Sequence, residues 1–146
     1  MISLHFCRAG VRLCLLMMLS GCVIAAPKLK EERMWMTVGD KRFAITLEDN
    51  DSTRALAQLL PLTLDMAELH ANEKYASLPQ RLPARAARPG TIRNGDLMLY
   101  GNDTLVIFYQ TFESAYAYTR LGRVDSPDQL VETLGNGIVS VHFTLD

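Results

Sequence analysis

From Met34 onward, apolar and polar residues alternate in short runs that are typical of β-strands. In the run 34–38, every second residue is Met or Val, and the run 43–47 alternates in the same way. The two residues Gly39-Asp40 lie in the turn between these runs, which predicts a β-hairpin. Further strands are predicted over 62–66, 96–100, 105–109, 115–119 and 139–145. The run 105–109 is continuously apolar, as expected for a strand that is covered on both faces.

Two segments carry the signals of short helices. Asp51 or Ser52 is predicted to cap the first helix, and Pro61 is predicted to end it because proline cannot continue the backbone ladder. The apolar face of this helix consists of Ala55, Leu56, Leu59 and Leu60. A capping box that begins at Ser126 predicts the second helix, and Gly135 provides its stop.

The segment 70–94 is rich in proline and arginine and is predicted to be a long loop. Its arginines are Arg81, Arg85, Arg88 and Arg93. They could bind an anion, but ordinary solvation of a surface loop is preferred because no helix N-terminus or backbone nest is evident. Regularly spaced strands with only two short helices predict a mainly β fold, a closed or nearly closed β-barrel.

The first 33 residues are predicted to contain a targeting signal followed by a tether. Two arginines precede or flank a short apolar run, and Leu19-Ser20-Gly21-Cys22 then resembles the lipobox of bacterial lipoproteins. The expected organisation is a lipoprotein signal peptide at 1–21, a lipidated Cys22 with a tether at 22–33, and one domain at 34–146. Ordinary secretion with cleavage after Ala25 is the alternative. The expected location is the cell envelope, at the periplasmic side of the outer membrane in a Gram-negative cell, because Val23 is not the aspartate that retains many lipoproteins in the inner membrane.

The composition of the domain argues against several kinds of chemistry and partner. All three cysteines lie at or before Cys22, so the domain has no disulfide and no thiolate nucleophile. After cleavage at Cys22, 13 basic and 16 acidic residues remain, a net charge of −3, which argues against nucleic acid as a partner. His70 and its acidic neighbours match no metal-ligand spacing and His142 is expected on the outer sheet face, so we expect no metal and no cofactor.

Four segments together resemble the bacterial cyclophilin-like family of small single-domain proteins. They are Asn72–Pro79, Gly95–Gly101, Leu105–Phe112 and Tyr116–Arg123. The resemblance runs from about Met36 to Leu145 and implies the cyclophilin barrel. It does not carry prolyl isomerase activity with it, because the Phe-His-Arg and Gln-Gly-Gly-Asp segments of true cyclophilins are absent and Arg93–Asp96 has only a passing likeness to the second.

Aromatic residues close to one arginine form the candidate site. The candidate ligand-binding residues are Tyr109, Phe112, Tyr118 and Arg120, with Tyr116 among them in sequence and Tyr75 added by the fold resemblance. Aromatic side chains with one fixed cation suit a small ligand or a peptide segment, and an arginine can pair with a carboxylate. The expected function is therefore a membrane-anchored binding domain without an assigned catalytic residue.

Two alternatives remain open at this point. The tyrosines could simply pack the barrel with their hydroxyls at its rim, and Arg120 could pair with Glu73 or Asp96. Alternatively, Arg120 among aromatics could assist rotation about an X–Pro bond, which would make the domain a peptidyl-prolyl isomerase, as in true cyclophilins.

Overall fold

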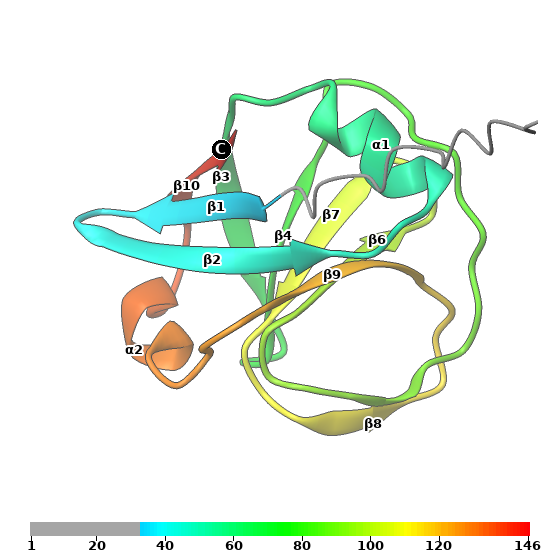
Figure 1. Ribbon diagram of the computed structural model, residues 1–146. Coiled ribbons are helices and arrows are strands. Elements are labelled where there is room, and N and C mark those ends of the chain that lie inside the picture. Colours follow the sequence, from blue (N-terminus) through cyan, green and yellow to red (C-terminus); the bar gives the residue numbers. More distant parts are fainter. Residues whose placement is uncertain (1–32) are drawn as a thin grey trace, which may run out of the picture.

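The computed structural model describes residues 33–146, which form ten strands and two short helices (Figure 1). The predicted signal peptide, Cys22 and the predicted tether as far as residue 32 lie outside the described residues. The strands are β1 (Arg33–Val38), β2 (Lys41–Leu47), β3 (Leu62–Leu69), β4 (Glu73–Ser77), β5 (Gly90–Ile92), β6 (Asp96–Tyr100), β7 (Thr104–Phe108), β8 (Phe112–Ser114), β9 (Thr119–Val124) and β10 (Val139–Leu145); the helices are α1 (Asp51–Ala57) and α2 (Leu130–Leu134).

Eight of these strands close into an antiparallel barrel, which confirms the predicted fold class. Their order around the barrel is β1-β10-β3-β4-β7-β6-β9-β2, and β2 pairs with β1. The remaining strands, β5 and β8, pair only with each other and form a two-stranded ribbon at the lower end of Figure 1. The two helices lie at opposite ends of the barrel (Figure 1).

The predicted hairpin is present, with Val38 opposite Lys41 across the turn. Gly39 has a φ of +59°, in the left-handed region that glycine enters without steric cost. The cap of α1 was predicted one or two residues too late. Asn50 is the N-cap, because its side chain accepts the backbone N–H of Thr53 while the Thr53 hydroxyl satisfies the Asn50 N–H.

The capping box predicted at Ser126 is wrong. The helix α2 begins only at Leu130, and its N-cap Gln129 makes no capping hydrogen bond. The predicted stop is confirmed, because the Gly135 N–H donates to the carbonyl of Val131 at 3.2 Å and its φ of +57° ends the helix. Both helices contribute leucines to the barrel interior: Leu56, Leu130 and Leu134.

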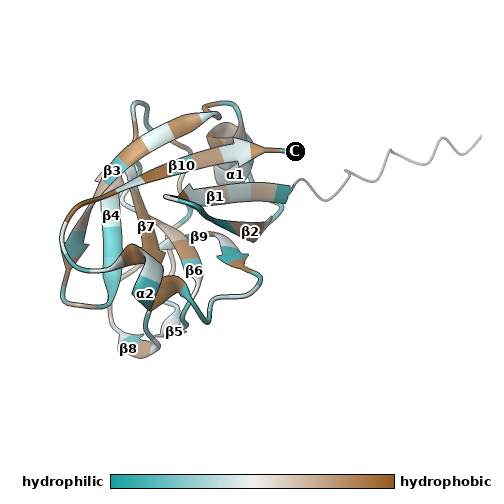
Figure 2. Ribbon diagram, turned by 90° about the vertical axis from the view of Figure 1, so that its left-hand side faces the viewer, coloured by the Kyte–Doolittle hydropathy of each residue, from teal (hydrophilic) through white to brown (hydrophobic). Residues whose placement is uncertain are grey.

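The loop predicted at 70–94 contains two strands, β4 and β5. The strand β4 escaped prediction because its first two residues are the charged Glu73 and Lys74, which read as solvated, whereas the structure buries both. In Figure 2 this strand is drawn largely in teal beside the more apolar β7. Downstream, Tyr116 and Tyr118 precede β9 and do not form a strand of their own, although Tyr118 makes a single β-bridge to Ala87.

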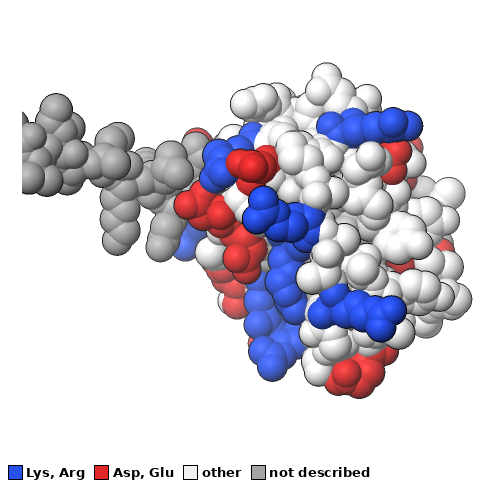
Figure 3. Space-filling model, turned by 90° about the vertical axis from the view of Figure 1, so that its right-hand side faces the viewer, with Lys and Arg blue, Asp and Glu red and all other residues white. Residues whose placement is uncertain are grey.

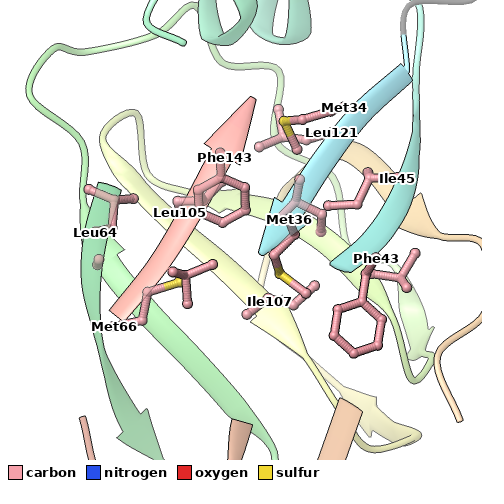
Figure 4. Close-up of a cluster of buried hydrophobic side chains, with 14 of the residues drawn as sticks. Met34, Met36, Phe43, Ile45, Leu64, Met66, Leu105, Ile107, Leu121 and Phe143 are labelled. Carbon is pink, nitrogen blue, oxygen red and sulfur yellow. The ribbon is translucent and has the colours of Figure 1, made fainter. Parts of the chain in front are cut away.

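The inward-facing side chains fill the barrel (Figure 4). Those drawn at its centre include Met34, Met36, Ile45, Leu64, Met66, Leu105, Ile107 and Phe143. A second, smaller cluster lies on the outer face of β6 and β7 beneath the ribbon, and consists of Ile92, Met98, Val106, Phe108 and Tyr118, with Phe112 packed against it. Consecutive residues of β7 therefore serve two cores, which explains why that strand is apolar throughout.

Candidate functional site

A hollow of about 520 Å³ opens between the outer face of β4 and β7 and the segment that begins with β8. We call it the aromatic hollow and define it by Glu73, Tyr75, Tyr100, Phe112, Tyr116 and Tyr118, which all line it. Its size falls within the range of about 300–1,000 Å³ that is usual for sites of small ligands. Alternation along β4 turns Glu73 and Tyr75 outward into the hollow, whereas Lys74 and Ala76 turn into the barrel.

The rings of the hollow are held at steep angles to one another. Tyr100 lies edge-on to Tyr116, with ring centroids 6.5 Å apart and planes at 87°. The Tyr100 and Tyr118 centroids are 5.7 Å apart, and Tyr118 in turn meets Phe108 of the second cluster at 5.5 Å and 89°. The buried ring of Phe108 thus supports Tyr118 from below, while Tyr116, with 66% of its surface exposed, forms the outer wall.

The structure brings together three of the five residues predicted for the site. Tyr75, Phe112 and Tyr118 line the aromatic hollow, as does the neighbouring Tyr116. Tyr109 does not, because it follows Phe108 on the opposite side of the chain; its ring is buried in the barrel interior, and its hydroxyl donates to Glu68. The prediction that Tyr109 belongs to the same aromatic group is therefore wrong.

Arg120 is also separate from the aromatic hollow. Its guanidinium Nη1 lies 3.5 Å from Oδ2 of Asp96, which is one of the two pairings considered from the sequence. Asp96 is buried and has two further partners, the backbone N–H of Arg93 at 2.9 Å and Nε of Arg123 at 3.8 Å. The side chain of Arg120 remains 47% exposed and lines a different hollow.

That second, charged hollow has a volume of about 650 Å³ and lies between α1 and the segment 83–89. Four arginines line it: Arg54, Arg85, Arg88 and Arg120. Its acidic residues offset part of this charge, since Arg54 pairs with Asp49 and Asp51. Figure 3, which views the side that carries the 83–89 segment, shows basic side chains in a stripe next to a group of acidic ones.

Glu73 is the buried carboxyl among the residues that line the aromatic hollow. Only 8% of its surface is exposed. Burial raises the pKa of this carboxyl, the negative charge of Glu68 raises it further, and His70 opposes the shift. Burial likewise raises the pKa of the Tyr118 hydroxyl, with a further contribution from Glu73, so Tyr118 is neutral at physiological pH.

Behind the hollow, inside the barrel, lies a polar cluster that sequence reasoning missed: Glu68, Lys74 and Tyr109. Lys74 is completely buried, and its Nζ lies 2.6 Å from Oε2 of Glu68 and 2.6 Å from the carbonyl oxygen of Gly137. Burial of Glu68 acts to raise its pKa, but the bonds from Lys74 and Tyr109 outweigh this, and the pKa lies below its ordinary value. The sequence gives little indication that Lys74 is buried. The one indication is that Lys74 directly precedes Tyr75, which faces outward, so that alternation along the strand turns Lys74 inward.

No group of three or more His, Cys, Asp or Glu side chains within residues 33–146 is arranged to hold a metal ion. His70 and His142 are both exposed, and Nδ1 of His142 bonds the hydroxyl of Thr63 on the outer face of the sheet at 2.8 Å. Neither helix in the described part of the chain is long and apolar enough to cross a membrane.

Comparison with known proteins agrees with this architecture. The model of the "Cyclophilin-like family" matches residues 36–145, so the chain belongs to the cyclophilin-like family. The solution structure of the hypothetical protein AF2241 from Archaeoglobus fulgidus is similar, with a TM-score of 0.54 and 16% sequence identity over 78% of this chain and 94% of that chain. At this identity the likeness concerns the fold alone. No curated protein matches the sequence significantly.

Proposed function

We propose that this cyclophilin-like domain is a binding module, and that its aromatic hollow takes a small molecule or a short peptide segment. The observation that carries the proposal is the combination of five aromatic side chains with one buried carboxyl in a single concavity; the five are Tyr75, Tyr100, Phe112, Tyr116 and Tyr118. An apolar, aromatic lining with few polar groups is the usual composition of a ligand site. Packing alone does not require Tyr116 to stand 66% exposed beside the hollow.

Prolyl isomerisation of the cyclophilin type is the second candidate, and family membership is what favours it. We place it second because rotation about an X–Pro bond has a barrier of about 18–20 kcal/mol, which a donor near the prolyl nitrogen would help to lower. No lysine or arginine is among the described residues that line the aromatic hollow. Arg120, which could have acted as that donor, is engaged with Asp96 at the charged hollow.

The binding proposal is tested by titrating isotope-labelled protein, as the full chain carrying Cys22→Ala, with four probes. These are 2-phenylethylammonium, 2-phenylethanol, 3-phenylpropionate and an uncharged prolyl tetrapeptide. At least one probe should shift the backbone amides of β4 and β8 and of residues 115–118 in a saturable manner. Tyr116→Ala should weaken that binding, whereas Ile138→Ala, which removes a 75% exposed side chain away from both hollows, should leave it unchanged. Shifts confined to other surfaces would overturn the proposal.

The same protein also separates binder from enzyme. A prolyl-peptide isomerisation assay should give no rate above the uncatalysed background. A rate above that background that disappears in Tyr118→Ala, but not in Ile138→Ala, would favour the isomerase and place its site at the aromatic hollow.

We further propose that a lipid on Cys22 anchors the domain to the bacterial cell envelope, on the periplasmic side of the outer membrane in a Gram-negative source. The lipobox Leu19–Cys22 supports this proposal. Several acyl chains on one cysteine give stable attachment, because each buried CH₂ contributes about 0.8 kcal/mol. Intact-mass analysis of the membrane fraction should find a lipid-modified N-terminus at Cys22, and Cys22→Ala should release a soluble or mis-processed form. An unmodified N-terminus at Ala26 would instead establish ordinary secretion.

A further inference from the structure

The charged side chains that line the aromatic hollow are mainly acidic. Two carboxyl side chains, Glu73 and Glu113, line it together with His70, and among the lining residues that the structure describes there is no lysine or arginine. The sequence had suggested an arginine anchor and hence an anionic ligand. The structure places a carboxyl where that cation was expected, which reverses the charge that a ligand would need.

Glu73 differs from the partly buried Glu68 and the buried Asp96 in having no partner among the described residues. Glu68 receives bonds from Lys74 and Tyr109, and Asp96 receives Arg93, Arg120 and Arg123. No hydrogen bond or ion pair from the described residues reaches the carboxylate of Glu73, although only 8% of the residue is exposed. The Glu73 oxygens are not among the fully enclosed polar atoms that lack a partner, so they are accessible from the hollow that the residue lines. A mostly buried carboxylate without a protein donor is costly, and a donor on a ligand in the hollow would offset that cost.

The tyrosines around this carboxyl are suited to the same kind of ligand. Tyr100 stands at 87° to Tyr116 and at 55° to Tyr118, so the three rings are not stacked flat on one another. The face of an aromatic ring carries negative potential and attracts ammonium groups, most strongly where water is excluded. Several aromatic rings around one ligand cation form the aromatic cage by which proteins recognise quaternary ammonium groups.

We infer that the aromatic hollow selects organic cations: an ammonium group, primary or methylated, carried on a small apolar body, with the ammonium at Glu73 and the body against the tyrosine rings. This inference rests on the proposed function, since it names the class of ligand that the hollow takes. The ammonium group supplies the donor that Glu73 lacks. A free amine and a lysine side chain of a peptide share this chemistry.

The experiment compares dissociation constants for three matched probes near neutral pH: 2-phenylethylammonium, the neutral 2-phenylethanol and the anionic 3-phenylpropionate. A charge-assisted hydrogen bond in a partly dry site corresponds to a preference of about tenfold or more for the cation over the neutral probe. Glu73→Gln should abolish this preference while leaving the affinity for 2-phenylethanol unchanged.

Glu113→Gln is the matched control. Glu113 also lines the hollow, but it is exposed and accepts a bond from the hydroxyl of Thr91, so its replacement should change the affinity for the cation by less than about twofold. Thermal melts of both variants establish that they fold. A capped tripeptide with central lysine, and the same peptide with norleucine, then distinguish a peptide side chain from a free amine as the source of the cation.

The outcomes separate the two proposals. If the neutral probe binds at the hollow as tightly as the cation, the inference about cations is overturned and the binding function stands. If neither any of these three probes nor the prolyl tetrapeptide binds at the hollow, both proposals fall. If the cation is preferred equally by the wild type and by Glu73→Gln, the assignment to Glu73 is wrong.

Discussion

The buried ion pair between Lys74 and Glu68 makes a sharp test of how the barrel interior is organised. Lys74 has no exposed surface, and its ammonium contacts only Glu68 and the carbonyl of Gly137 among its polar neighbours in the described chain. Replacing Lys74 with Met retains most of the side-chain volume and removes the charge. The carboxylate of Glu68 then loses its counter-ion and keeps the Tyr109 hydroxyl.

The size of the effect follows from the burial of the two partners. Breaking a buried pair by removing one partner costs about 3–5 kcal/mol. The side chain of Glu68 is 23% exposed and can recover some hydration, so we expect a loss near the lower end, about 3 kcal/mol. For the 114 residues 33–146, an unfolding entropy of about 0.24 kcal/mol per kelvin converts this loss into a fall in Tm of about 12 °C.

The double variant Lys74→Met/Glu68→Gln is the decisive comparison. It removes both charges, and the Gln side chain can still accept the bond from Tyr109, so most of the lost stability should return. Glu68→Gln alone should be the most destabilised of the three, because it strands an ammonium that has no access to water. Urea titrations of the four proteins measure the coupling directly. A loss below about 1 kcal/mol in Lys74→Met would refute the reasoning.

The stability difference between the wild type and Lys74→Met should depend on pH in a definite direction. The pKa of Glu68 in the folded protein lies below its ordinary value of 4.5, so the unfolded chain binds the proton more readily. The stability that the carboxylate contributes is therefore fully present above the ordinary pKa and is lost as the pH falls through the folded pKa. The gap between the wild type and Lys74→Met should narrow on acidification below about pH 4.5.

Three further predictions concern single side chains. Phe108→Ala should cost about 3–5 kcal/mol in a denaturant titration, because Phe108 is fully buried in the second cluster; a loss below about 1 kcal/mol would mean that its side of β7 is not packed. Glu73→Gln should raise Tm at neutral pH, and the gain should vanish in melts below about pH 4, because the raised pKa means that folding favours the protonated carboxyl; a fall in Tm at neutral pH would refute this. Arg120→Ala should cost less than about 1 kcal/mol, since its contact with Asp96 is half-exposed and two other donors remain; a strong fall in Tm would make the pair structural.

The barrel could be predicted from the sequence because its strands obey a simple period. In β1, β2 and β10 the inward side of the sheet is marked by Met36, Ile45 and Val141, each within an alternating run. A period of two survives wherever one face is buried and the other is solvated. The alternation and the family resemblance therefore both predict the β-barrel, without any knowledge of the strand pairing.

The aromatic site was only partly predictable, because sequence proximity does not specify the side of the sheet. Tyr109 and Phe112 are three residues apart, yet the first enters the barrel and the second covers its outer face. In a fully apolar run such as β7, both faces look alike, so no pattern tells which of Phe108 and Tyr109 faces inward. Only the resemblance of its segment to the family indicated that Tyr75 lies near Phe112 and Tyr118, with which it lines the hollow.

Glu73 and Lys74 show why the rest of the site depends on strand register. The two residues are neighbours on β4, and pairing of Lys74 with Glu68 across to β3 sends the lysine inward and the glutamate into the aromatic hollow. A shift of one residue would reverse every side chain of β4 and would bring Glu73 into the barrel next to Glu68, which would place two like charges close together. The ion pair with Lys74 thus favours the one register in which the unpartnered carboxyl of Glu73 faces the tyrosines. The sequence of β4 alone does not show which residue of β3 faces Lys74, so it does not distinguish the two registers. The charge of the hollow could therefore be assigned only once the strand pairing was known.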